Sequence, residues 1–267
     1  MNQLNLFIEL TRLKKPIGYM LLFWPCAWGL TLVYDLSNNI NVYFFYLLLF
    51  FLGSVLMRSA GCIVNDILDR KFDKQVARTK DRPIASGKIK ISTGLFYAAL
   101  LCALAFLVLI NFNYFTILIA LASMPLAFTY PLMKRYTYWP QLFLGVTFNY
   151  GLILGWTSIS GNLNIIPIIF YFGAIFWTLG YDTIYGYQDI KDDEIIGLKS
   201  TSIKFKGNTK LFLIICYLIL IFSLTIGGYL MNFNLFYFLF LIIPIVQLFL
   251  YQIKTFDPNN SNSFLSY

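Results

Sequence analysis

Three long segments of this chain contain no Asp, Glu, Lys or Arg: residues 91–133, 136–181 and 211–253. Each is about twice as long as the roughly 20 apolar residues that cross a bilayer as a helix. Each also has one short polar break near its middle, at residues 111–113, 160–164 and 232–234. The pattern therefore predicts three helical hairpins, each made of two membrane spans.

Two more apolar stretches near the start of the chain bring the predicted number of spans to eight. Their continuous apolar character favours helices over a β-barrel, whose strands alternate apolar and polar residues. We predict an all-α, polytopic transmembrane helical bundle of two four-helix halves, forming a single membrane-embedded domain over residues 1–267. The spans are expected near residues 16–34, 43–65, 91–110, 114–133, 140–160, 165–187, 211–231 and 234–253.

Basic residues are confined to alternate loops, which sets the expected orientation in the membrane. Nineteen of the 20 Lys and Arg residues lie before the first span, in the loops at 66–90, 134–135 and 188–210, or at Lys254. An even number of spans puts all of them on one face, and the positive-inside rule makes that face cytoplasmic. We expect a bacterial inner membrane, or alternatively the mitochondrial inner membrane. Before the first span, apolar and basic residues mixed over 6–15 predict a short interfacial helix.

Composition narrows the functions that this chain can have. It is 59% hydrophobic and 12% charged, so the net charge of +8 reflects membrane topology, and no nucleic-acid partner is expected. The absence of histidine excludes imidazole as a metal ligand or general base. The four cysteines are scattered through apolar spans without the spacing of metal ligands, and we expect them to pack as small side chains.

Two acidic clusters lie just after apolar spans, at matching positions in the two halves. The first, Asn65 to Asp73, has one amide and three carboxylates in nine residues, and the second runs from Asp182 to Glu194. Carboxylates at a membrane boundary are costly, so they are usually kept for ions, protons or substrates. Two pairs of acids share a separation of 120 positions: Asp69 with Asp189, and Asp73 with Asp193. This repeat indicates related halves whose acidic ends meet around one cavity.

Helical spacing places the polar side chains of each cluster on one stripe. These stripes are Asn65, Asp69 and Asp73 in the first cluster, and Asp182, Asp189 and Asp193 in the second. Carboxylate and amide oxygens without His or thiolate suit Mg²⁺, which commonly bridges a few carboxylates and a substrate phosphate. The alternative is that these acids are solvated and only balance a basic loop. The occurrence of two such clusters favours the metal site.

One basic residue, Arg58, lies within a predicted span. It precedes Asn65 by seven residues and so lies roughly 10 Å deeper on the same helix face, at 1.5 Å per residue. A charged side chain inside the membrane is a candidate functional residue by default. Two roles are open: an internal ion pair with one of the aspartates, or an anchor for the carboxylate of a second substrate.

The two acidic segments resemble the two aspartate motifs of the UbiA superfamily of intramembrane prenyltransferases. Residues 58–73 and 78–83 match the first motif, and residues 181–193 and 197–201 match the second. Residues 16–18, 24–25 and 130–137 add to the similarity, which is greatest to the branch of 4-hydroxybenzoate polyprenyltransferases. The resemblance extends over nearly the whole chain. Family members generally have nine spans, and we expect the ninth to be missing here.

The resemblance implies roles for individual residues. Five of them would hold Mg²⁺ on a polyprenyl diphosphate: Asn65, Asp69, Asp73, Asp189 and Asp193. The other substrate-binding residues would be Arg58, Arg78, Arg82, Lys134, Arg135 and Lys199. Since cations beside metal-binding carboxylates suit a diphosphate, the basic loops agree with this assignment. Either Asp182 or the released diphosphate would take the proton from the aromatic ring.

The resemblance implies an Mg²⁺-dependent enzyme in membrane lipid that transfers a polyprenyl group from polyprenyl diphosphate to 4-hydroxybenzoate. The new bond would form ortho to the hydroxyl, as a step of ubiquinone synthesis. Naphthoate, homogentisate, tetrapyrrole or haem acceptors are alternatives within the family. A cation-coupled transporter is the alternative from another class, and the position of the acids at one membrane face rather than the midplane disfavours it.

Overall fold

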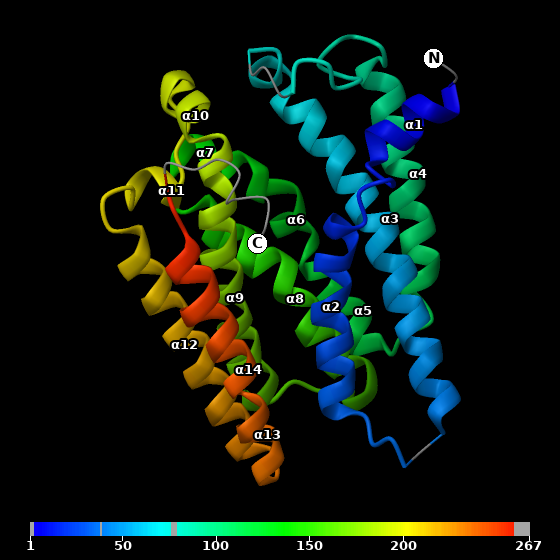
Figure 1. Cartoon of the computed structure of the whole chain (residues 1–267). Helices are drawn as coiled ribbons and strands as arrows, with labels where there is room; N and C mark the ends of the chain where they lie inside the picture. Colours follow the sequence, from blue (N-terminus) through cyan, green and yellow to red (C-terminus); the bar gives the residue numbers. More distant parts are fainter. Residues whose placement is uncertain (1–2, 38, 76–78, 259–267) are drawn as a thin grey trace. The chain divides into compact units, whose positions relative to one another are not determined.

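A computed structural model describes residues 3–37, 39–75 and 79–258, and every regular element within these ranges is a helix (Figure 1). Seven helices or runs of helices are long and apolar enough to cross a membrane, and a shorter apolar helix covers residues 17–33. These eight coincide with the eight predicted spans. The chain is therefore a polytopic helical integral membrane protein, as predicted.

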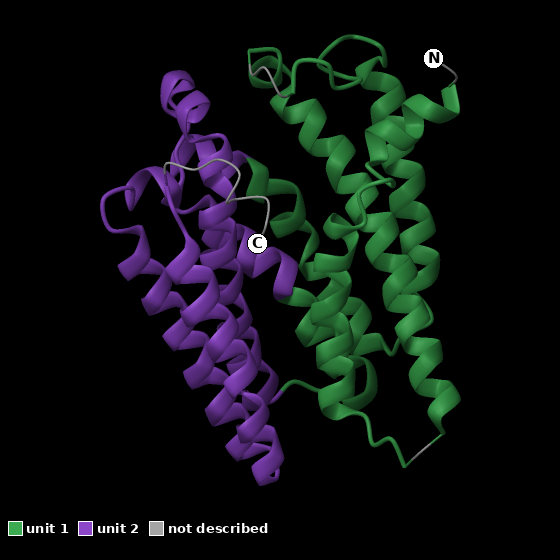
Figure 2. Cartoon of the chain, viewed as in Figure 1, with its two compact units in different colours: residues 1–131, 150–163 green, residues 132–149, 164–267 purple. Residues whose placement is uncertain are grey.

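The chain divides into two compact units, which are described separately (Figure 2). Unit 1 comprises residues 1–131 and 150–163, and unit 2 comprises residues 132–149 and 164–267. Helix α8, Pro140–Ser160, begins in unit 2 and ends in unit 1.

Unit 1 is organised around one long helix. Helix α3, Ile40–Asp73, has 34 residues, so at 1.5 Å per residue it is roughly 50 Å long and continues beyond the predicted span. The carboxylates of the first cluster thus lie on the same rigid helix as the span. The other helices of the unit are α1 (Gln3–Thr11), α2 (Ile17–Val33), α4 (Ile91–Leu109), α5 (Tyr114–Ala122) and α6 (Met124–Thr129).

The expected interfacial helix is present as α1, which packs on the polar end of α3. Its Leu6 and Leu10 are buried in a cluster with Ile63 and Ile67 of α3. By contrast, α4 leaves large apolar side chains such as Phe96 exposed, as expected for a helix that faces lipid. The core of unit 1 therefore lies along α3, directly beneath the acidic cluster.

Helices α2 and α8 approach at glycines, because no side chain separates their backbones there. A Cβ atom on Gly29 of α2 would lie 1.9 Å from the carbonyl oxygen of Leu152, and one on Gly155 would lie 2.1 Å from that of Cys26. Small residues of this kind allow membrane helices to pack closely. All four cysteines are free, and Cys26, Cys62 and Cys216 are buried.

Unit 2 is built on α9 (Ile165–Tyr185) and α12 (Thr209–Leu230), which pack along each other. Gly180 of α9 lies against the ring of Tyr217, whose hydroxyl donates a 2.7 Å hydrogen bond to Oε1 of Gln252. Gln252 belongs to a π-helical stretch, Val246–Ile253, that ends the last span. The remaining elements of the unit are a 3₁₀ turn (Tyr130–Leu132, shared with unit 1), α7 (Met133–Tyr136), a 3₁₀ turn (Gly186–Gln188), α10 (Ile190–Ile196), α11 (Thr201–Lys204), α13 (Leu235–Phe240) and α14 (Ile242–Ile245).

Candidate active site

The polar side chains of the first cluster lie on successive turns at the end of α3. Asp69 is 1% exposed and Asp73 is 6% exposed. The Oδ1 atom of Asn65 is buried and has no hydrogen-bond partner among the described residues. A buried carbonyl oxygen without a partner is costly and calls for an explanation. An amide oxygen beside two buried carboxylates is the donor set that a hard divalent cation prefers, so these residues fit Mg²⁺.

Arginines pair with the carboxylates of this cluster. The Nη1 atom of Arg82, one of the predicted diphosphate ligands, lies 2.9 Å from Oδ2 of Asp73 and 3.2 Å from Oδ1 of Asp66. A second arginine, Arg12, lies 2.5 Å from the same Oδ1 atom. Asp66 is 2% exposed, so its carboxylate is buried, whereas Arg12 and Arg82 are partly exposed. Neither Arg12 nor Asp66 was assigned a role from sequence, although Asp66 lies within the motif.

The loop after α3 is fastened to the helix it follows. The hydroxyl of Thr79 donates a buried 3.0 Å hydrogen bond to the carbonyl oxygen of Asp73. This bond helps to hold the start of the loop that carries Arg82. Arg78, another predicted diphosphate ligand, lies outside the described residues.

Arg58 lies deeper on α3, as predicted, and contacts two other segments that carry the family resemblance. Its side chain hydrogen-bonds the hydroxyl of Tyr130. Its guanidinium also lies against the start of α2, because a Cβ atom on Gly18 would be 2.8 Å from Nε of Arg58. Gly18 and Tyr130, one residue from each of these segments, therefore meet the first motif at Arg58.

In the second cluster, the expectation of one continuous stripe is wrong. Asp182 lies on α9, which ends at Tyr185, whereas Asp189 precedes α10 and Asp193 lies within it. The physical reason is a close contact at Gly186. The Oγ atom of Ser202 lies so near the backbone there that a Cβ atom added to Gly186 would be only 2.4 Å from it. The same Ser202 hydroxyl donates a 2.7 Å hydrogen bond to the carbonyl oxygen of Thr183 and so occupies one of the backbone acceptors at the end of α9. The chain therefore tightens into a 3₁₀ turn and starts a new helix.

A buried polar network positions the second cluster within unit 2. The hydroxyls of Thr183 and Thr201 are 2.7 Å apart, and the backbone N–H of Thr201 donates 3.0 Å to Oε1 of Gln141. Ser200 caps α11 by accepting from the backbone N–H of Ile203. Sequence reasoning missed this network, although hydroxyl and amide side chains at the ends of apolar spans were the available signal.

Two segments of unit 2 that carry predicted substrate-binding residues also lie against each other. The backbone N–H of Lys199 donates 2.8 Å to the carbonyl oxygen of Lys134, and Nζ of Lys199 donates 3.2 Å to that of Tyr136. Arg135, which lies between these acceptors in the chain, is half-buried. The backbone around Lys134 and Arg135 thus lies against Lys199, next in sequence to Ser200 and Thr201 of this network.

Among the described residues, no group of three or more acidic, Cys or His side chains lies close enough together to hold a metal ion.

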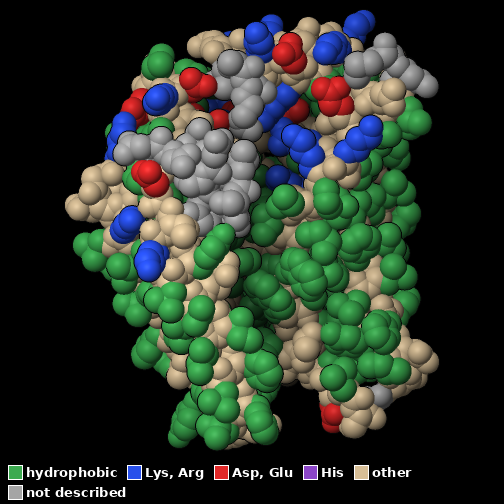
Figure 3. All heavy atoms as spheres, in the orientation of Figure 1, with side chains coloured by type: hydrophobic (Ala, Val, Ile, Leu, Met, Phe, Trp, Pro, Cys, Tyr) green, Lys and Arg blue, Asp and Glu red, His purple; other side chains and the backbone are tan. Residues whose placement is uncertain are grey.

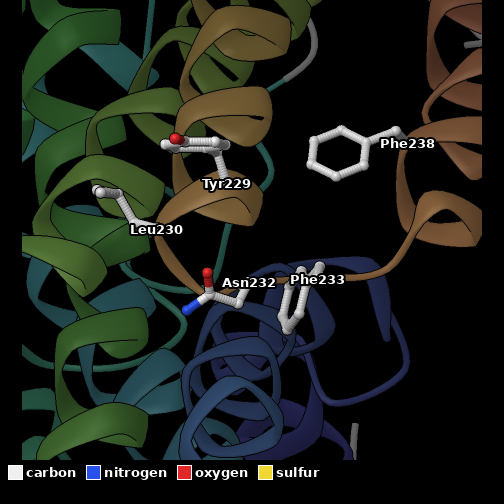
Figure 4. A pocket seen from close by; sticks show the side chains of 5 residues that line it. All are labelled: Tyr229, Leu230, Asn232, Phe233 and Phe238. Carbon is white, nitrogen blue, oxygen red and sulfur yellow. The ribbon is translucent and has the colours of Figure 1, made fainter.

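A pocket of about 410 Å³ lies elsewhere, at the far end of α12 (Figure 4). It is lined by Tyr229, Leu230, Asn232, Phe233 and Phe238 and contains no charged side chain. Helix α12 has 22 residues, so this pocket lies roughly 30 Å from α11 along the helix. It is not part of the acidic site.

On the face seen in Figure 3, most charged side chains gather at one end of each unit (compare Figure 2), and hydrophobic side chains make up much of the remaining surface. Apolar helices that end in buried carboxylates and arginines are typical of a membrane-embedded protein with a polar site at the membrane boundary. The chain matches the model of the UbiA prenyltransferase family over residues 22–264, and it belongs to that family.

Named relatives and a solved structure are consistent with this assignment. The chain is 48% identical over 205 residues to the mitochondrial 4-hydroxybenzoate polyprenyltransferase of Rattus norvegicus, a match that covers 76% of this chain and 54% of the rat protein. It is 42% identical over 254 residues to 4-hydroxybenzoate geranyltransferase 2 of Lithospermum erythrorhizon, covering 94% of this chain and 81% of that one. A UbiA homologue from Archaeoglobus fulgidus bound to DMAPP and Mg²⁺ shares the fold, with a TM-score of 0.71 and 17% identity over 97% of this chain and 94% of that one.

Proposed function

We propose that this chain transfers a polyprenyl group from polyprenyl diphosphate to the ring of 4-hydroxybenzoate, as a step of ubiquinone synthesis. The observation that carries the proposal is the end of α3, where the unpartnered Oδ1 of Asn65 lies beside buried Asp69 and Asp73 with Arg82 on Asp73. Such an alternation of acids and cations suits a metal-bound diphosphate. The names of the rat and Lithospermum relatives support 4-hydroxybenzoate as the acceptor.

In this mechanism the allylic C–O bond breaks and its electron pair leaves with the diphosphate. Mg²⁺, when held by Asn65, Asp69 and Asp73 with Asp189 and Asp193 of unit 2, supplies charge neutralisation for the departing group. Arg82 adds hydrogen bonds that strengthen as the leaving group gains charge. We include Arg78, Lys134, Arg135 and Lys199 among the substrate-binding residues.

The ring carbon ortho to the hydroxyl of the acceptor then attacks the prenyl carbon. The ring proton passes to Asp182 or to the released diphosphate, which restores aromaticity. Holding both substrates in one site replaces a bimolecular encounter in the bilayer, and apolar helices around the site keep water from the allylic cation.

The direct test is product analysis by mass spectrometry after purified protein receives 4-hydroxybenzoate and prenyl diphosphates of several lengths. We expect a prenylated acid and release of diphosphate that requires Mg²⁺. A cation-coupled transporter would release no diphosphate under these conditions. A product formed only with a naphthoate or a homogentisate would instead change the assigned acceptor.

Arg58 is proposed to bind the carboxylate of the acceptor. Arg58→Gln should raise the KM for 4-hydroxybenzoate about tenfold or more, because a charge-assisted hydrogen bond is lost, and leave the KM for the prenyl diphosphate nearly unchanged. Steady-state kinetics with each substrate varied in turn measures the difference. Tyr130→Phe is the matched control, since it removes the hydroxyl that Arg58 bonds and keeps both charge and ring. Equal effects of the two variants would mean that Arg58 acts only through Tyr130.

The location follows from the same topology argument. We propose that the acidic motifs lie on the face with the basic loops, which is the cytoplasmic face of a bacterial inner membrane or the matrix face of a mitochondrial one. The mitochondrial name of the rat relative supports the second of these locations.

A further inference from the structure

The N-terminal helix brings to the first acidic motif an arginine that is not part of the motif. Arg12 follows α1, and its Nη2 atom donates to Oδ1 of Asp66 over 2.5 Å. Arg82 donates to the same oxygen over 3.2 Å. Two guanidinium groups therefore meet at one buried carboxylate oxygen, next in sequence to Asn65.

Packing holds Arg12 at this place. Leu6 and Leu10 of α1 are buried against α3, and Phe7 contacts the ring of Tyr97 edge-on. Arg12 has a φ of 55°, in the left-handed region that costs free energy for a residue with a side chain. Such a conformation persists where surrounding contacts over-determine it, and the ion pair with Asp66 is one of these contacts.

The formal charges at this point balance, so what distinguishes Arg12 is its remaining N–H groups. Asp66 and Asp73 contribute two negative charges, and Arg12 and Arg82 contribute two positive charges. Arg12 donates only to Asp66 among the described residues, although a guanidinium has five N–H donors. Its side chain is 24% exposed, so the remaining donors are accessible to a ligand.

We propose that Arg12 is a further diphosphate-binding residue and that Asp66 is a positioning residue for Arg12 and Arg82 rather than a metal ligand. This inference rests on the proposed prenyl transfer, which supplies the diphosphate. Arginine binds phosphate oxygens through paired N–H groups, and the remaining accessible N–H donors of Arg12 suit such an anion. Helix α1 thereby becomes part of the substrate site as well as a membrane-surface helix.

The test is equilibrium binding of geranyl diphosphate, in the presence of Mg²⁺, to the purified full chain in detergent. Arg12→Gln is expected to raise the Kd about tenfold, because a charge-assisted contact to the diphosphate is lost. Lys14→Gln is the matched control, since it removes the same charge from an exposed residue two positions away. If both variants raise the Kd equally, the effect is one of general surface charge, and the inference is overturned.

Asp66 is tested with the double variant Arg12→Gln/Asp66→Asn. Since Asp66 acts through the arginines, the combined increase in Kd should be smaller than the product of the two single increases. If the combined increase in Kd equals the product of the two single increases, the positioning role of Asp66 is overturned. The double variant also removes both partners of a buried ion pair, so it reports on diphosphate binding even where Arg12→Gln alone fails to fold.

Two outcomes separate this inference from the proposed function. If the unaltered chain does not bind geranyl diphosphate in Mg²⁺, the proposed function fails and this inference fails with it. If the unaltered chain binds and Asp69→Asn does not, the proposed function stands. If Arg12→Gln then binds geranyl diphosphate as tightly as the unaltered chain, only the proposed role of Arg12 is rejected.

Discussion

Asp69→Asn is expected to lower the rate of prenyl transfer between about a hundredfold and a thousandfold, the range found when a preorganised electrostatic group is removed from an active site. Asn keeps the shape of the side chain but carries no negative charge to bind Mg²⁺. Asp69 is 1% exposed, so the substitution acts within the buried cluster. The measurement is turnover of prenyl diphosphate and 4-hydroxybenzoate at saturating Mg²⁺.

The matched control for this prediction is Asp81→Asn. Asp81 is an exposed acid in the loop after α3, so its substitution removes the same charge from the same face without touching the buried cluster. Its turnover should stay within about twofold of the unaltered chain, as is usual for surface substitutions. Near-normal turnover by Asp69→Asn would reject the metal role of this carboxylate.

The spans could be predicted because hydropathy reflects a strong physical constraint. A helix in hydrocarbon must be apolar over about 20 residues, so the segments later found as α4, α9 and α12 are visible in sequence without knowledge of packing. The extension of α3 to Asp73 was also implied, because Asn65, Asp69 and Asp73 share one helical stripe only if the helix continues.

The contacts that complete the site could not be predicted in the same way. Arg12 and Asp66 are separated by 54 positions, and nothing in either segment specifies the partner. The break after Tyr185 depends on the Ser202 hydroxyl, which comes from a separate helix and bonds the carbonyl oxygen of Thr183. Such tertiary hydrogen bonds override local helical spacing, which is why the second stripe was predicted as continuous and is not.

The two acidic clusters therefore differ in how they are held. The first lies on a continuous helix and is tied to arginines, whereas the second spans a 3₁₀ turn fixed by Thr183, Thr201 and Gln141. The acidic residues of the two halves thus have similar sequence spacing but different local backbone structures.

Gly29→Ala is expected to destabilise the protein by about 3 kcal/mol or more, because overpacking against backbone exceeds the usual cost of an added methyl group. The new Cβ would lie 1.9 Å from the carbonyl oxygen of Leu152, and neither helix has a flexible side chain there that can move aside. Helices α2 and α8 must then separate, which disturbs Gly18 at the start of α2 and its contact with Arg58. Thermal unfolding in detergent should show a lower Tm. Gly53→Ala is the matched control, since its Cβ would meet only Val108 at 4.0 Å. An equal Tm for the two variants would show that α2 and α8 do not pack backbone to backbone.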